Sequence, residues 1–100
     1  AEAGAPPTPG LRLAPNTPNP FTLSTTLHYA LPGAGRVTVS IYAPSGALVR
    51  RLVDDWQPGG EHAITWDGRT ARGAEVGSGV YFARLTSGDA VVTRRLVLAR

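Results

Sequence analysis

Apolar and polar residues alternate with a period of two along most of this chain. No stretch without Gly or Pro shows the three-to-four spacing of an amphipathic helix. The alternation is clearest in residues 36–42, where Val37, Val39 and Ile41 fall on one side. Successive side chains of an extended strand point to opposite faces, so this pattern predicts strands with one buried face. The chain is therefore predicted to be all-β.

Turn signals divide the alternating pattern into seven predicted strands. They are residues 11–14, 25–31, 36–42, 47–53, 61–66, 79–86 and 91–98. Pro and Gly lie between them, and the Pro-Ser-Gly and Ser-Gly-Asp turns at 44–46 and 87–89 predict tight hairpins. Short antiparallel strands at this spacing are typical of two stacked sheets. The predicted fold is an immunoglobulin-like seven-stranded antiparallel β-sandwich, without the cysteine pair of antibody domains.

The first ten residues, AEAGAPPTPG, contain three prolines and two glycines and no large apolar side chain. Such a composition is typical of an extended linker. We therefore expect residues 1–10 to be a Pro/Gly/Ala-rich linker and residues 11–100 to be the sandwich domain. The linker and the absence of Met indicate a piece of a longer protein with another domain upstream.

Charge and cysteine content narrow the classes of function. The ten basic residues are all Arg, the net charge is +3, and the arginines are spread along the sequence from Arg12 to Arg100. A protein that binds nucleic acid usually concentrates its positive charge on one face, so the spacing argues against nucleic acid as a partner. The chain has no Cys, which excludes disulfides and thiolate chemistry. No segment approaches the roughly 20 apolar residues of a membrane helix, so no membrane insertion is expected.

No motif predicts catalysis, a metal site or a cofactor. His28 and His62 lie in different predicted strands, without the spacing of zinc ligands. Asp54 and Asp55 are sequence neighbours, whose side chains point apart on a strand. The loop 67–75 begins like a calcium loop but lacks acidic residues at its third and fifth positions, so Asp67 is better explained as a turn cap. We expect no enzyme activity.

Aromatic residues raise one binding hypothesis. Trp56 precedes Pro58 in a predicted loop, and Tyr42 has the outward parity of its strand. Together the two rings would form a platform for sugar stacking. Trp66, Tyr29 and Tyr81 have core parity and are interpreted as packing residues.

The order of the turn motifs is more specific than any single residue. It runs through Pro-Asn-Pro-Phe at 18–21, Thr-Thr-Leu-His-Tyr-Ala-Leu-Pro at 25–32, Val-Ser-Ile-Tyr at 39–42, Trp-Asp-Gly at 66–68, Ser-Gly-Val-Tyr-Phe at 78–82, Gly-Asp at 88–89 and a basic last strand. From residue 11 to residue 100 the chain resembles the type IX secretion C-terminal sorting domains (type A). It is similar also to the related Ig-like domain of flagellar hook-capping proteins, the FlgD-like domains.

The resemblance implies a C-terminal sorting signal that directs a larger secreted protein through the type IX outer-membrane translocon. Its implied partners are the outer-membrane secretion machinery, a sortase and an upstream catalytic or adhesive domain. Its implied location is secreted or cell-surface, reached through the periplasm. The family positions for translocon recognition correspond to Gly79, Tyr81, Leu85, Gly88, Arg94, Arg95 and Arg100, with Arg where the family usually has Lys in the last strand. The alternatives are an accessory carbohydrate-binding or structural Ig-like module and a hook-cap-type assembly domain.

Overall fold

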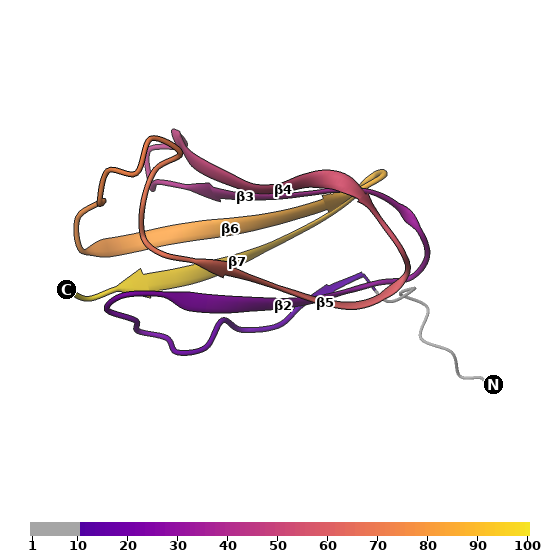
Figure 1. Cartoon of the computed structure of the whole chain (residues 1–100), viewed down its shortest axis with the longest axis horizontal. Coiled ribbons are helices and arrows are strands. Elements are labelled where there is room, and N and C mark those ends of the chain that lie inside the picture. Colours follow the sequence, from indigo (N-terminus) through magenta and orange to yellow (C-terminus); the bar gives the residue numbers. More distant parts are fainter. Residues whose placement is uncertain (1–10) are drawn as a thin grey trace.

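The computed structural model describes residues 11–100, which form seven strands and no helix (Figure 1). The strands are β1 (Arg12–Leu13), β2 (Thr25–Leu31), β3 (Gly35–Tyr42), β4 (Leu48–Gln57), β5 (Gly60–Trp66), β6 (Gly79–Ser87) and β7 (Ala90–Leu98). The predicted linker, residues 1–10, lies outside the described residues. Among the described residues no helix is long and apolar enough to cross a membrane.

The strands form two antiparallel sheets that face each other as two layers (Figure 1). One sheet has the order β1-β2-β5 and the other the order β4-β3-β6-β7. The predicted all-β sandwich and its seven strands are confirmed. The predicted bounds of β2 are also confirmed, and those of the other strands differ by one to four residues.

Strand β4 differs most from its prediction, because it continues four residues beyond Val53 to Gln57. Asp is common in turns, so Asp54 and Asp55 indicate a turn in the sequence. Because β4 is an edge strand, both side chains stay exposed to water and the strand can include them. The β3–β4 pairing has two irregularities, between Val39 and Ser40 and between Ile41 and Tyr42. Each shifts the register by one residue, so the polarity of β4 does not alternate cleanly.

Three rings form an aromatic centre at one end of the core. Trp66 is fully buried, with its ring centroid 5.7 Å from that of Phe21 and 5.5 Å from that of Tyr81. The indole Nε1 donates a hydrogen bond of 2.9 Å to the carbonyl of Arg69, which satisfies its only polar atom. The predicted core positions of Trp66 and Tyr81 are confirmed, and Tyr29 is buried as well.

The segment before β2 connects the two sheets. Thr17 pairs with Thr26 of β2, and four residues later Phe21 pairs in parallel with Leu98 of β7. The backbone N–H of Phe21 donates to the Val97 carbonyl at 2.9 Å, and its carbonyl accepts from Ala99 at 2.8 Å. This crossing covers part of the open edge of β7 and places the Phe21 ring in the core.

A small polar cluster fixes the start of this crossing. Asn16 is buried, and its Nδ2 donates to Thr25 Oγ1 at 2.8 Å and to the Pro18 carbonyl at 3.2 Å. Thr25 Oγ1 in turn donates to the same carbonyl at 2.8 Å. A buried polar group is costly unless it is hydrogen-bonded, so this cluster holds the crossing in one conformation.

Candidate functional site

Four of the seven residues that the resemblance assigns to recognition serve the fold itself. Tyr81 and Leu85 are buried in the core. Gly79 and Gly88 have positive φ angles of 152° and 59°. Gly88 is the first residue of the two-residue turn between β6 and β7, a position where a positive φ favours Gly. A partner cannot contact these core side chains unless the domain unfolds.

The three arginines of the set lie in different surroundings. Arg94 points to the open side of the sandwich, where its Nε donates a 2.6 Å hydrogen bond to the carbonyl of Leu13 in β1. Arg100 packs at one end of the domain. Arg95 is exposed and pairs with Phe82 on the outer side of the four-stranded sheet. The fold therefore separates these three cations, and Arg95 alone keeps an outward position on a sheet face.

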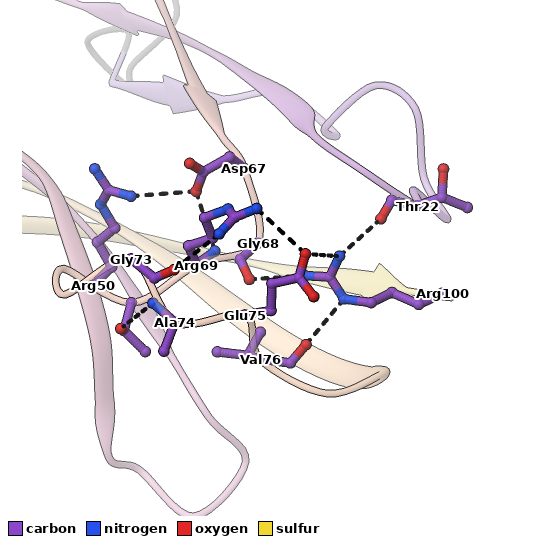
Figure 2. Close-up of polar contacts among 11 residues, drawn as sticks. Thr22, Arg50, Asp67, Gly68, Arg69, Gly73, Ala74, Glu75, Val76 and Arg100 are labelled. Atoms are coloured by element: carbon purple, nitrogen blue, oxygen red, sulfur yellow. Dashed lines mark hydrogen bonds and ion pairs between the residues drawn. The ribbon is translucent and has the colours of Figure 1, made fainter.

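Arg100 holds three segments of the chain together (Figure 2). Its guanidinium donates to the carbonyls of Gly68 at 2.9 Å, Val76 at 3.1 Å and Thr22 at 3.4 Å. Its backbone N–H donates to Ser78 Oγ at 3.0 Å. The side chain is only 24% exposed, so it acts as a clamp between the last strand, the β5–β6 loop and the loop before β2.

The β5–β6 loop, residues 67–78, is organised by arginines. Asp67 accepts a hydrogen bond from the backbone N–H of Arg69 at 3.1 Å, which confirms its predicted role as a turn cap. The same carboxylate oxygen lies 3.2 Å from Arg50, and Glu75 lies 3.4 Å from the guanidinium of Arg69 (Figure 2). Both acidic groups are thus paired with cations, which opposes the binding of a metal ion between them.

The two residues of the predicted sugar platform do not come together. Trp56 lies in strand β4, where the sequence had predicted a loop, and it pairs with Arg36 of β3. Tyr42 stands six residues further along β3, which corresponds to about 20 Å of extended chain. Trp56 is 67% exposed. Each ring is accessible on the same side of the sheet, but the pair cannot stack on one sugar.

The histidines have separate contacts. His62 stacks on Tyr29 with ring centroids 5.3 Å apart, and its Nε2 lies 2.8 Å from the Pro58 carbonyl. The Tyr29 hydroxyl donates a 2.5 Å hydrogen bond to Gln57 Oε1. Burial raises the pKa of Tyr29 above 10.0, and the hydrogen bond to Gln57 opposes that shift in part. Within residues 11–100 no three His, Asp or Glu side chains gather as a metal site would require.

The outer side of the β4-β3-β6-β7 sheet is a surface that sequence spacing did not reveal, and we call it the basic face. The register places one side chain from each strand in rows across it. In the order β4, β3, β6, β7, the first row is Leu48, Tyr42, Phe82 and Arg95, and the second is Arg51, Ser40, Arg84 and Thr93. The third row is Asp54, Thr38, Thr86 and Val91. Beyond it, Trp56 of β4 pairs with Arg36 of β3. The face thus collects four arginines and one carboxylate, an excess equal to the net charge of +3 of the whole chain. The positive charge that appears scattered in the sequence is gathered by the fold.

The chain is similar to known proteins both in sequence and in fold. The family model of the FlgD Ig-like domain matches residues 20–90. A search of the curated proteins finds no match. Among solved structures, PorZ of Porphyromonas gingivalis is described as an essential bacterial surface component of the type-IX secretion system. It is 21% identical with a TM-score of 0.61, over 88% of this chain and 11% of PorZ.

Two further solved structures share the fold. FlgD from P. aeruginosa is 22% identical with a TM-score of 0.59, over 76% of this chain and 62% of that one. Dimeric latent PorU from P. gingivalis is 21% identical with a TM-score of 0.64, over 86% of this chain and 9% of that one. The chain spans less than two thirds of the length of each of the three structures, and at this identity the likeness shows the fold alone.

Proposed function

Since the chain belongs to the FlgD Ig-like domain family, we propose that it is a non-catalytic C-terminal sorting domain, which directs a larger exported protein through the type IX outer-membrane translocon. In this role it is an interaction module without a cofactor. Its partners are the outer-membrane secretion machinery, a sortase and the upstream domain that it carries. The whole protein is then secreted or held at the cell surface after passing through the periplasm.

The fold comparison with PorZ carries this proposal. A sandwich like this one makes up 11% of PorZ, so in a surface component of the type-IX secretion system it is a small part of a larger chain. The proportion in PorU is similar, with 9% of its chain covered. A domain that travels with much larger proteins and has a closed core with an aromatic centre is suited to recognition as a folded unit.

The placement of the motif residues adds to the argument. Tyr81 and Leu85 build the core, and Arg100 clamps one end, so most of the residues that resemble a sorting signal also make the fold. Recognition would then depend on the closed sandwich. Removal of residues 96–100 would also remove the buried Leu96 and Leu98. Such a truncation would therefore test folding as well as sorting, and it is a poor test of sorting by itself.

A fusion experiment tests the proposal. A fluorescent reporter with a signal peptide is fused upstream of residues 1–100 and expressed in a bacterium that has a type IX system. We expect the reporter at the cell surface or in the medium. The same fusion in a strain that lacks the translocon, and the reporter without the domain, should both stay in the periplasm. Retention of the intact fusion in the periplasm of the competent strain would contradict the proposal.

The match to FlgD favours a second candidate, a hook-cap-type assembly domain. The fold covers 62% of the P. aeruginosa FlgD chain, a much larger share than in PorZ. An assembly domain requires self-association or filament partners. Sedimentation of the isolated chain at rising concentration separates the two candidates, because a sorting domain has no need to associate with itself.

A further inference from the structure

The composition of the basic face differs from that of an ordinary protein surface. Three of the four large hydrophobic residues that are exposed in the described chain lie on it, namely Leu48, Trp56 and Val91. Tyr42 and Phe82 are half-buried there, and the face has no Glu and no Lys. Protein–protein interfaces are enriched in aromatic residues and Arg and depleted in Lys and Glu. The face therefore has the composition of an interface.

Among the described residues, three of the four cations of this face have no carboxylate partner. Arg36 is paired with Asp54 at 2.6 Å. Within residues 11–100 no carboxylate lies within ion-pair distance of Arg51, Arg84 or Arg95. Arg84 and Arg95 are diagonal neighbours on β6 and β7, and diagonal neighbours lie roughly 7–8 Å apart between Cα atoms. Two fork-shaped guanidiniums at this spacing can each bind one carboxylate of the same partner.

The centre of the face is already ordered. The guanidinium carbon of Arg84 lies 5.0 Å from the centroid of the Tyr42 ring, and Arg51 Nε donates to Ser40 Oγ at 3.3 Å. A shallow depression of about 260 Å³ lies beside them, lined by Tyr42, Ala43, Pro44, Gly46, Phe82, Arg84 and Thr93. Side chains held in place before binding lose less entropy on binding. The depression can receive one side chain of a partner next to Arg84.

We propose that the basic face is the docking surface of this domain, and that its occupant is a partner protein whose contact surface carries carboxylates. This inference rests on the proposed function and names the surface that the secretion machinery would read. Four strands spaced about 4.8 Å apart and roughly eight residues long give a face on the order of 500 Å². An interface of that size is typical of transient complexes, which suits a cargo that must be passed on.

The opposite outer face, on the β1-β2-β5 sheet, has a different character. It has the larger depression, about 440 Å³, lined in part by Ala14, His28, Ala30 and Ala63. Arg12 and Glu61 also line it, so its charge is balanced. It has neither the exposed aromatic rings nor the excess charge of the basic face, and it supplies a matched control surface.

Charge reversal tests the docking surface. In the reporter fusion, Arg84→Glu and Arg95→Glu are combined, and the control combines Arg12→Glu with Arg72→Glu, two exposed arginines away from the basic face. Both double variants change the net charge equally. We expect export to fall at least tenfold for the first pair and to stay within twofold of wild type for the control. Thermal unfolding of the isolated chains checks that both remain folded.

Site-specific cross-linking identifies the occupant. A photoreactive phenylalanine replaces Thr93 on the basic face or His28 on the opposite face, and the cells are irradiated during export. We expect a discrete protein adduct from position 93 alone, lost in the Arg84→Glu/Arg95→Glu background, with Asp or Glu residues in the cross-linked peptide of the partner. An adduct to glycan or to a second copy of the chain would overturn the proposal, as would equal loss of export in both double variants.

If the wild-type fusion is not exported, the proposed function fails and this inference fails with it. If the wild type and the basic-face variant are both exported, only this inference fails.

Discussion

The Arg100 clamp allows a quantitative prediction, because one side chain joins three segments and can be removed without opening the core. In Arg100→Ala the hydrogen bonds to the carbonyls of Gly68, Val76 and Thr22 are lost together. The free energy of unfolding should fall, and the β5–β6 loop should loosen around Val76. The effect should be local, since Trp66 and Phe21 keep their contacts.

The magnitude follows from the exposure of each acceptor. A net hydrogen bond is worth about 0.5–1.5 kcal/mol, and one to a charged group about 1.5–3 kcal/mol. Gly68 is buried, so loss of the hydrogen bond to its carbonyl costs the most free energy. Val76 and Thr22 are more exposed, and water can replace the hydrogen bonds to their carbonyls. The contact of Arg100 with Glu75 is long, at 3.8 Å, and exposed. Together these contacts give a loss of about 2–3 kcal/mol, which corresponds to a fall in Tm of roughly 8–24 °C for a domain of this size.

Urea unfolding of wild type, Arg100→Ala, Arg100→Lys and Arg72→Ala measures the effect. Lys keeps the charge but cannot reach three carbonyls at once, so Arg100→Lys should fall between wild type and Arg100→Ala. Arg72 lies exposed in the same loop, and its replacement should change stability by less than about 0.5 kcal/mol. Hydrogen exchange should show faster exchange of the Val76 amide, which donates to the same Gly68 carbonyl at 3.0 Å. If Arg100→Ala stays within about 0.5 kcal/mol of wild type, Arg100 is not a clamp.

Three further substitutions test the fold. Burial favours the protonated form of Tyr29 in the folded state, so its contribution to stability is present below pH 10.0 and is lost as the pH rises through the raised pKa. Tyr29→Phe should therefore reduce the fall in Tm at alkaline pH. The same fall in Tm in wild type and variant would count against this. Phe21→Ala should cost about 3–5 kcal/mol in urea unfolding, whereas Leu23→Ala, at an exposed site in the same segment, should cost little; similar costs would contradict the role of the crossing. A Cβ on Gly59 would lie 2.9 Å from the Cα of Gly33, so Gly59→Ala should lower the free energy of unfolding by about 1–3 kcal/mol. A Cβ on Gly33 would meet open space, so Gly33→Ala is the control. Equal losses of stability in the two variants would refute the clash.

The fold could be predicted from the sequence because its signals are local. The alternation in residues 36–42 and the Pro–Gly turns depend on neighbours along the chain, and β3 formed where they indicated. Pro18 and Pro20 disfavour helix at the residues before them, which is a local signal for the extended segment that leads to Phe21. The end of β4 was missed because Asp54 and Asp55 look like loop residues, although an exposed edge strand accepts them.

The candidate surface depends on register, which the sequence pattern does not fix. Arg51 lies far from Arg84 and Arg95 in the sequence, and the three meet only because β4 and β6 flank β3 and β7 pairs with β6. The two irregularities in the β3–β4 pairing decide which residues of β4 point outward. The predicted platform of Tyr42 and Trp56 failed for a related reason. The sequence placed Trp56 in a loop, and only the register shows that it lies in β4, at the opposite end of the sheet from Tyr42.

The pairing of Phe21 with Leu98 makes closure of the sandwich depend on the last strand, β7. A hydrogen bond from the Val97 amide to Asn19 Oδ1, at 3.0 Å, joins residues 78 positions apart. Contacts of such long range form slowly, and none of them can form until the last strand has been synthesised. A chain cut short by premature termination would leave Phe21 and Trp66 without their cover and would not close. If the closed sandwich is what the export machinery reads, a chain cut short before β7 would carry no valid signal.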